Sequence, residues 1–152
     1  MRTLDTLAAA LLSLAATIHP ATAQSITDGD TLKLGGTTYR LWGIDAPEAK
    51  QWCGDYPAGV LATATLETLM KGRAGVECEA RDVDRYGRTV AVCRVDGRDL
   101  GKAMVELGMA WAFTRYSQDY VADEERAKQA GRGVHGRGCL PAWEWRSEQR
   151  RR

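Results

Sequence analysis

The chain lacks a strong net charge. Its 21 lysine and arginine residues face 20 aspartate and glutamate residues, which gives a formal net charge of +1. It is therefore no general polycation, and any affinity for nucleic acid must come from a local basic patch. Histidine is also scarce, with 2 in the sequence, and no pair of cysteines has the CxxC spacing. These shortages argue against a zinc site, and no histidine, serine or cysteine triad is evident.

Long hydrophobic runs are missing as well. The apolar stretch at residues 7–18 is shorter than a membrane-spanning helix requires, and no other stretch is long enough. It follows Arg2 and precedes Ala21-Thr22-Ala23, a small-residue cleavage pattern. Residues 1–23 are therefore predicted to be a signal peptide, which makes the protein secreted or periplasmic. A membrane anchor is the alternative interpretation of this segment.

The cysteines predict disulfides, because an even number follows a signal sequence. Three pairings are possible among Cys53, Cys78, Cys93 and Cys139. Cys78 and Cys93 lie on two alternating runs, and if they oppose each other the connecting loop falls on the turn residues around Gly87. This geometry favours Cys78–Cys93 and leaves Cys53–Cys139 as the second pair.

Hydrophobic periodicity and turn residues predict an α+β chain. Alternating residues at 31–34 and 37–44 flank Gly35-Gly36, which predicts a β-hairpin. Further strands are expected around the two paired cysteines and at 109–113. Helical spacing predicts three helices, at residues 57–70, 100–107 and 119–130. About five short strands suit a closed barrel over residues 24–146, followed by a basic tail at 147–152.

Acidic residues gather in turn-rich segments beside the predicted strands. Asp30 precedes one strand and Asp45 follows another, so neighbouring strands would bring both carboxylates to a single cation. Oxygen ligands favour calcium or magnesium over zinc. Glu48, after Pro47, is a candidate further ligand or general base for water. A plain turn around Asp30 and an ordinary helix-starting acid at Glu48 remain alternatives.

Two arginines accompany these acids. Arg40 lies in an otherwise apolar strand, and Arg88 follows a sharp turn at Gly87, close to Tyr86. Planar guanidinium groups bind phosphate through two parallel hydrogen bonds, although surface arginines and a solvated loop are the alternatives. The remaining charged residues of that loop are assigned to a solvated face: Arg81, Asp82, Asp84 and Arg85. Acids for a hard cation beside arginines for an anion predict metal-assisted phosphate chemistry.

Taken together, the motifs resemble the staphylococcal nuclease (thermonuclease) family. They read DGDT at 28–31, YRLWGIDAPE at 39–48, DRYGR at 84–88 and PAWEWR at 141–146, so the resemblance spans roughly residues 26–146. It implies a five-stranded OB-fold-type β-barrel with three α-helices. It also implies a calcium-dependent phosphodiesterase that cuts DNA and RNA with little sequence preference.

The resemblance also implies a role for each matching residue. Asp30 and Asp45 would be Ca²⁺ ligands together with the backbone carbonyl of Ala46, which stands where a threonine is frequent. Glu48 would be the general base or would orient the water. Arg40 and Arg88 would hold the scissile phosphate, and Tyr86 would contact a neighbouring one. These groups are expected at a solvent-open site of a monomer that needs no stable protein partner.

Two other classes of function compete with this interpretation. The first is a catalytically inactive OB-fold module that binds nucleic acid or protein, and loss of catalytic residues would identify it. Arg40, Asp45, Glu48 and Arg88 are all present, which favours the enzyme. The second is a disulfide-stabilised structural or inhibitor domain.

Overall fold

The computed structural model describes residues 24–73 and 75–152. The predicted signal peptide at 1–23 lies outside the described residues and stays a prediction. Within the described part, no helix is both long enough and apolar enough to cross a membrane. The chain is α+β, and its elements in order are β1 Gln24–Asp28, β2 Thr31–Leu34, β3 Thr37–Leu41, β4 Ile44–Asp45, α1 Ala58–Met70, β5 Val76–Val83, β6 Thr89–Val95, β7 Arg98–Asp99, α2 Leu100–Glu106, β8 Trp111–Ala112, α3 Val121–Gln129, the 3₁₀ turn η1 Gly133–Gly136 and α4 Ala142–Arg151.

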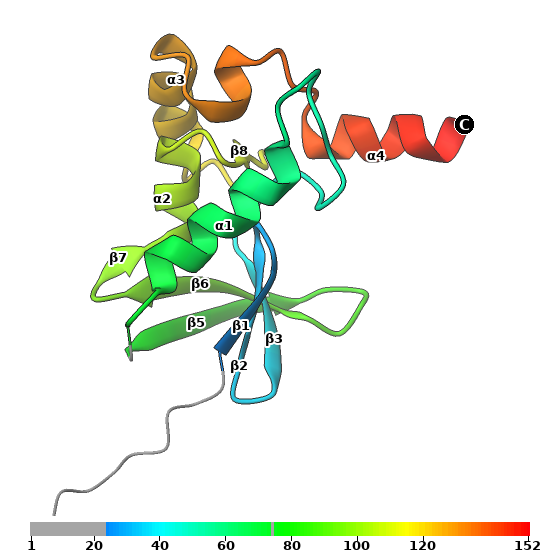
Figure 1. The fold of residues 1–152 in the computed structure, drawn as a ribbon. Helices are drawn as coiled ribbons and strands as arrows, with labels where there is room; N and C mark the ends of the chain where they lie inside the picture. The colour runs from blue at the N-terminus through cyan, green and yellow to red at the C-terminus, as the bar shows by residue number, and fades with distance from the viewer. Residues whose placement is uncertain (1–23, 74) are drawn as a thin grey trace, which may run out of the picture.

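Five strands form the OB-type barrel sheet in the order β1-β2-β3-β6-β5, and β7 is added to β6. Neighbouring strands are antiparallel except β3 and β6, which run parallel. Figure 1 shows β1 to β3 crossing β5 and β6 steeply, so that the sheet is strongly twisted, while α1 lies across it. The first strand, β1, is short and pairs with β2 from Gln24 to Asp28.

Two glycine turns shape the segment that carries the predicted site. Gly35 and Gly36 have φ angles of 54° and 89° and close the predicted β2–β3 hairpin. Gly43 has φ 69°, and a Cβ there would lie 3.0 Å from the Tyr120 ring. This turn splits the predicted strand 37–44 into β3 and β4, because the chain leaves the barrel at Gly43 and β4 pairs with β8 instead. Asp45 is carried on β4 as a result.

The three predicted helices are confirmed as α1, α2 and α3. Asp99 caps α2, as its side chain accepts a hydrogen bond of 3.1 Å from the Lys102 amide. A fourth helix, α4, was not predicted. It follows Pro141, whose carbonyl accepts from the amides of Glu144 and Trp145, and it includes residues 147–151 of the segment that was predicted to be a basic tail.

The core has two parts. The larger lies between the barrel sheet and helices α1 and α2, and includes Leu32, Leu41, Leu66, Leu100 and Met104, none more than 1% exposed. The smaller packs the base of α4 against α1, β8 and η1, and consists of Ala58, Trp111, Val134 and Ala142, with Cys53, Tyr56, Cys139 and Trp143 packed against it. The second part positions α4 through Ala142 and Trp143 at its base.

Both predicted disulfides are present. Cys78 and Cys93 are direct partners in the β5–β6 register, with Cα atoms 4.0 Å apart. Cys53 and Cys139 are 86 residues apart in sequence and have Cα atoms 5.1 Å apart. The second bridge therefore fastens the loop after Glu48 to the segment that leads into α4.

The two bridges should differ in what they stabilise. On the chain-entropy model each contributes about 3 to 5 kcal/mol to the free energy of unfolding. The double variant C53S/C139S should lower the melting temperature and also speed amide hydrogen exchange in α4. C78S/C93S is the matched control, since it should lower the melting temperature and leave exchange in α4 unchanged.

Thermal unfolding and hydrogen exchange by mass spectrometry check this expectation. Peptide mapping of the unreduced protein should recover the Cys53–Cys139 and Cys78–Cys93 peptides. Free thiols at all four positions, or equal exchange in α4 for both double variants, would contradict it.

Candidate active site

A cleft of about 910 Å³ lies beside β3 and β4 and is bordered by the β5–β6 loop and α4. Figure 1 shows this loop and α4 projecting on the same side of the barrel. The predicted site residues that line the cleft are Asp30, Arg40, Ala46, Glu48, Tyr86 and Arg88. Asp45 is 0% exposed and accepts hydrogen bonds from two arginines that line the cleft, Arg40 and Arg146. The fold thus brings all seven predicted groups to one place.

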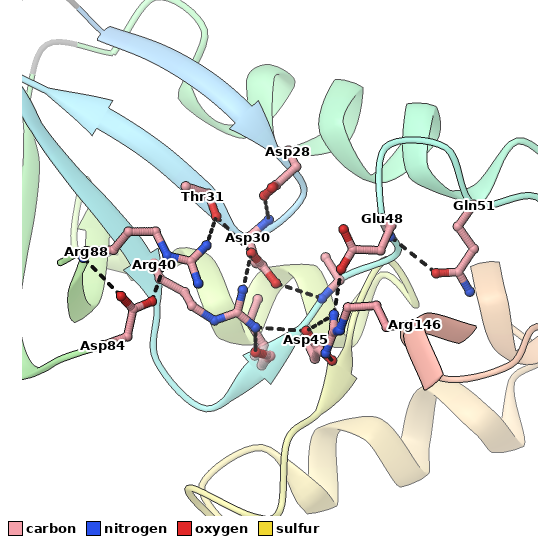
Figure 2. Close-up of polar contacts among 12 residues, drawn as sticks. Asp28, Asp30, Thr31, Arg40, Asp45, Glu48, Gln51, Asp84, Arg88 and Arg146 are labelled. Atoms are coloured by element: carbon pink, nitrogen blue, oxygen red, sulfur yellow. Dashed lines mark hydrogen bonds and ion pairs between the residues drawn. The ribbon is translucent and has the colours of Figure 1, made fainter. Parts of the chain in front are cut away.

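Arg40 bridges the two central carboxylates. Its Nη1 lies 2.7 Å from Asp30 Oδ1 and its Nη2 lies 2.8 Å from Asp45 Oδ1 (Figure 2). Asp30 is 4% exposed, so both acids are buried. Burial works to lower the pKa of Arg40, but the two carboxylates outweigh it and raise that pKa above its usual value. The Arg40 side chain is 18% exposed and lines the cleft above these two acids.

The remaining hydrogen bonds of Asp30 fix its orientation. Its Oδ1 accepts from the Thr31 hydroxyl at 3.0 Å, and its Oδ2 accepts from the Ala46 amide at 3.0 Å. Ala46 thus reaches the cluster through its N–H, whereas its carbonyl was the predicted ligand. Asp28 accepts from the Asp30 amide at 3.1 Å, and burial together with the charge of Asp30 raises the pKa of Asp28 to about 6.

Asp84 holds Arg88 in the cleft. Its Oδ2 lies 2.7 Å from Arg88 Nε, and its Oδ1 accepts from the amides of Tyr86 and Arg88. Burial works to raise the pKa of Asp84, but these hydrogen bonds outweigh it and lower that pKa below its usual range. Arg88 also donates to the Thr31 hydroxyl at 3.3 Å, which links it to Asp30. The assignment of Asp84 to a solvated face is therefore wrong.

Tyr86 stands at the rim of the cleft. Its side chain is 69% exposed on the β5–β6 loop. The guanidinium carbons of Arg85 and Arg88 lie 4.8 Å and 5.5 Å from the centre of its ring. Cation–π contacts of this kind favour a position of the ring beside the two guanidinium groups.

Glu48 meets the cluster through a residue that was not predicted. Arg146 of α4 places Nη1 at 2.6 Å from Glu48 Oε1 and Nη2 at 2.7 Å from Asp45 Oδ2 (Figure 2). Burial works to lower the pKa of Arg146, but the hydrogen bonds and the negative charges of Asp45 and Glu48 outweigh it and raise that pKa. Two signals in the sequence point to it: Pro141 as a helix start, and the Cys53–Cys139 pair, which brings this segment to the Glu48 loop.

Gln51 anchors the Glu48 loop, and no sequence pattern marks it. Its side chain is 1% exposed; Oε1 accepts from the Glu48 amide at 3.2 Å and Nε2 donates to the Leu140 carbonyl at 2.8 Å. The Gln51 amide in turn donates to the Glu48 carbonyl at 2.7 Å. The loop is thereby held against the segment that precedes α4.

Comparison with known proteins identifies the architecture. A family model described as "Staphylococcal nuclease homologue" matches residues 38–135. The chain belongs to the staphylococcal nuclease family.

Named relatives agree with this membership. The chain is 33% identical over 143 residues to succinoglycan biosynthesis protein ExoI of Rhizobium meliloti (strain 1021), covering 88% of this chain and 75% of that protein. It is 34% identical over 129 residues to an uncharacterized endonuclease of Escherichia coli O157:H7, covering 80% of each chain. It is 32% identical over 139 residues to a micrococcal nuclease of Shigella flexneri, covering 80% of this chain and 76% of that protein. The protein is a nuclease-type hydrolase of this family, and its substrates are nucleic acids.

The chemistry of the cluster suits a hard cation in this nuclease. Four carboxylates, those of Asp28, Asp30, Asp45 and Glu48, stand against the guanidinium groups of Arg40 and Arg146. The four carboxylates outnumber the two guanidinium groups, so the cluster has an excess of negative charge. All of its candidate metal ligands are oxygen atoms, which suits calcium or magnesium. Within the described ranges, no three acidic, histidine or cysteine side chains form a ready cage; guanidinium groups lie between the carboxylates instead.

The first turn of α1 packs against the Glu48 loop so closely that only glycine fits there. A Cβ on Gly59 would lie 1.9 Å from the Glu48 carbonyl oxygen. Gly59→Ala should therefore displace the loop, lower the free energy of unfolding by roughly 1 to 3 kcal/mol, as overpacking does, and lower nuclease turnover.

Gly75→Ala is the matched control, because a Cβ there would meet nothing within 4 Å. Thermal unfolding and cleavage of plasmid DNA measure both variants. Wild-type stability and turnover in Gly59→Ala would show that the contact does not constrain the loop.

Proposed function

We propose that this nuclease is a calcium-dependent phosphodiesterase that hydrolyses DNA and RNA with little sequence specificity. The observation that carries the proposal is the arrangement of five residues at one cleft. Asp30 and Asp45 are buried, Glu48 is partly exposed, and Arg40 and Arg88 are held by ion pairs. The chemistry is an in-line attack of water on the phosphorus atom, with cleavage of the opposite P–O bond.

The cation and its ligands come first. Asp30 and Asp45, with the carbonyl of Ala46, would hold Ca²⁺, and the bound cation supplies positive charge that neutralises the phosphate oxygens. Oxygen ligands and the excess negative charge of the cluster support this assignment, because a soft metal prefers nitrogen or sulfur.

Arg40 and Arg88 bind the phosphate and offset the charge that develops on it. Each is held by a carboxylate before substrate arrives, Arg40 by Asp30 and Asp45 and Arg88 by Asp84. Asp84 engages Arg88 through Nε, which directs the outer edge of the guanidinium to an anion in the cleft. Donors fixed in advance need no reorganisation during the reaction, which is the usual source of electrostatic catalysis.

Glu48 takes a proton from the attacking water. Its side chain is 37% exposed and lines the cleft, so water reaches its oxygens. A carboxylate in this position accepts the proton as the new P–O bond forms. Gln51 holds the backbone of Glu48 and thereby limits where the carboxylate can lie.

Low sequence specificity follows from what these groups contact. Guanidinium groups and a cation recognise phosphate, which DNA and RNA share, and phosphate contacts carry no sequence information. Tyr86, at the rim, would contact a neighbouring phosphate. The enzyme would act as a monomer, secreted or periplasmic, where oxidising conditions preserve both disulfides.

A cleavage assay on oxidised protein tests the proposal. Wild type should cut DNA and RNA in calcium and lose this activity in a chelator. Glu48→Gln, which removes the proton acceptor and keeps the shape, should lower turnover by about 10² to 10⁴. Glu67→Gln is the matched control, since Glu67 lies on the exposed face of α1 outside the cleft.

The outcomes separate the competing functions. Full activity after exhaustive chelation would exclude the cation, and wild-type turnover in folded Glu48→Gln would exclude its role as base. Binding of DNA without cleavage, in calcium, would identify an inactive binding module.

A further inference from the structure

Arg146 is the cluster residue that lies beyond the matched family model. The matched region ends at residue 135, whereas Arg146 belongs to α4 at Ala142–Arg151. It nevertheless makes three contacts with the carboxylates assigned above to the cation and the water, at 2.6, 2.7 and 3.2 Å. A residue beyond the matched region therefore contacts the site directly.

Arg146 occupies the hydrogen-bonding positions of the Asp45 carboxylate that Arg40 does not use. Asp45 Oδ1 accepts from Arg40 Nη2 and from Arg146 Nη1, while Oδ2 accepts from Arg146 Nη2 alone among the described residues. Asp45 is fully buried, so a ligand reaches Oδ2 from the position that this guanidinium occupies. A cation bound there would also sit beside a positive charge, and like charges at such a distance repel strongly in a partly buried site.

We propose that Arg146 is a tethered counter-ion that competes with the divalent cation for Asp45 and Glu48. It neutralises these acids in the cation-free protein and leaves them when the cation binds, so it weakens cation binding and sets the concentration at which the nuclease works. This inference rests on the proposed function, because it takes Asp45 as a cation ligand.

The base of α4 is fixed while the arginine side chain is not. Cys139 is bonded to Cys53, the Leu140 carbonyl accepts from Gln51, and Ala142 is fully buried. Trp143 packs against Phe113, with ring centres 5.4 Å apart. The Arg146 side chain is 31% exposed and lines the cleft, so rotation of its own bonds withdraws it without unfolding the helix. Tethering keeps the guanidinium at a high effective concentration, which makes the competition effective and reversible.

Calorimetric titration with Ca²⁺ tests the competition. Arg146→Ala should bind Ca²⁺ roughly ten- to a hundredfold more tightly than wild type, the factor that corresponds to one charge-assisted contact. Arg146→Lys keeps the charge and loses the bidentate contact, so its Ca²⁺ affinity should lie between those of wild type and Arg146→Ala. Arg151→Ala is the matched control: it removes the same charge from an exposed position of the same helix and should leave the affinity unchanged.

The melting temperature measured in chelator and in Ca²⁺ is a second, independent test of the competition. Arg146→Ala should melt below wild type there, because Asp45 loses a partner, and the difference should shrink in saturating Ca²⁺. A purely structural role for Arg146 would lower stability in both conditions and would not tighten Ca²⁺ binding.

The failures are distinguishable. Unchanged or weaker Ca²⁺ binding in Arg146→Ala, with calcium-dependent cleavage intact, overturns the competition alone. Absence of Ca²⁺ binding in wild type and all variants overturns the proposed cation, and with it the role of Arg146 as its competitor. An equal gain of Ca²⁺ affinity in Arg151→Ala would show that the net charge of the protein, and not the contact with Asp45, causes the gain. That result would also overturn the proposal.

Discussion

The bridge from Arg40 to Asp30 and Asp45 is the interaction on which the site depends. Two carboxylates that are 4% and 0% exposed need positive charge beside them, because an unpaired buried charge is costly. Removing one partner of such a pair typically costs about 3 to 5 kcal/mol. The β2–β3 hairpin and the Gly43 turn both serve this bridge, since they bring residues 30, 40 and 45 to one end of the barrel.

The site is assembled from two parts of the chain. Residues 28–48 and the β5–β6 loop supply the acids together with Arg40 and Arg88, and the segment from Cys139 to α4 returns to border the cleft. A disulfide, the buried side chain of Gln51 and the packing of Trp143 join the two parts. The family model ends at residue 135, before α4, so the charged helix that borders the cleft lies beyond the matched region.

Local patterns predicted most of the fold and of the site. Alternation, glycine turns and helical spacing identified the β2–β3 hairpin and three helices, and the register of β5 and β6 pairs Cys78 with Cys93 as expected. What they missed depends on contacts between distant segments. Asp84 has the sequence context of a loop residue, and only the structure shows its ion pair with Arg88. Gln51 belongs to no local pattern, although its side chain bonds to the Leu140 carbonyl. Arg146 contacts Asp45, which lies about 100 residues earlier in the chain, because α4 packs beside the barrel.

A crystal structure of the protein with Ca²⁺, with the cation located by anomalous scattering, would show whether the carboxylates of Asp30 and Asp45 hold a cation and whether Arg146 responds to it. We expect one calcium peak about 2.3 to 2.6 Å from oxygens of Asp30 and Asp45, with the Arg146 guanidinium withdrawn from Asp45. A structure without a peak there at millimolar calcium, or with Arg146 still bridging Asp45 and Glu48 beside the cation, would contradict it.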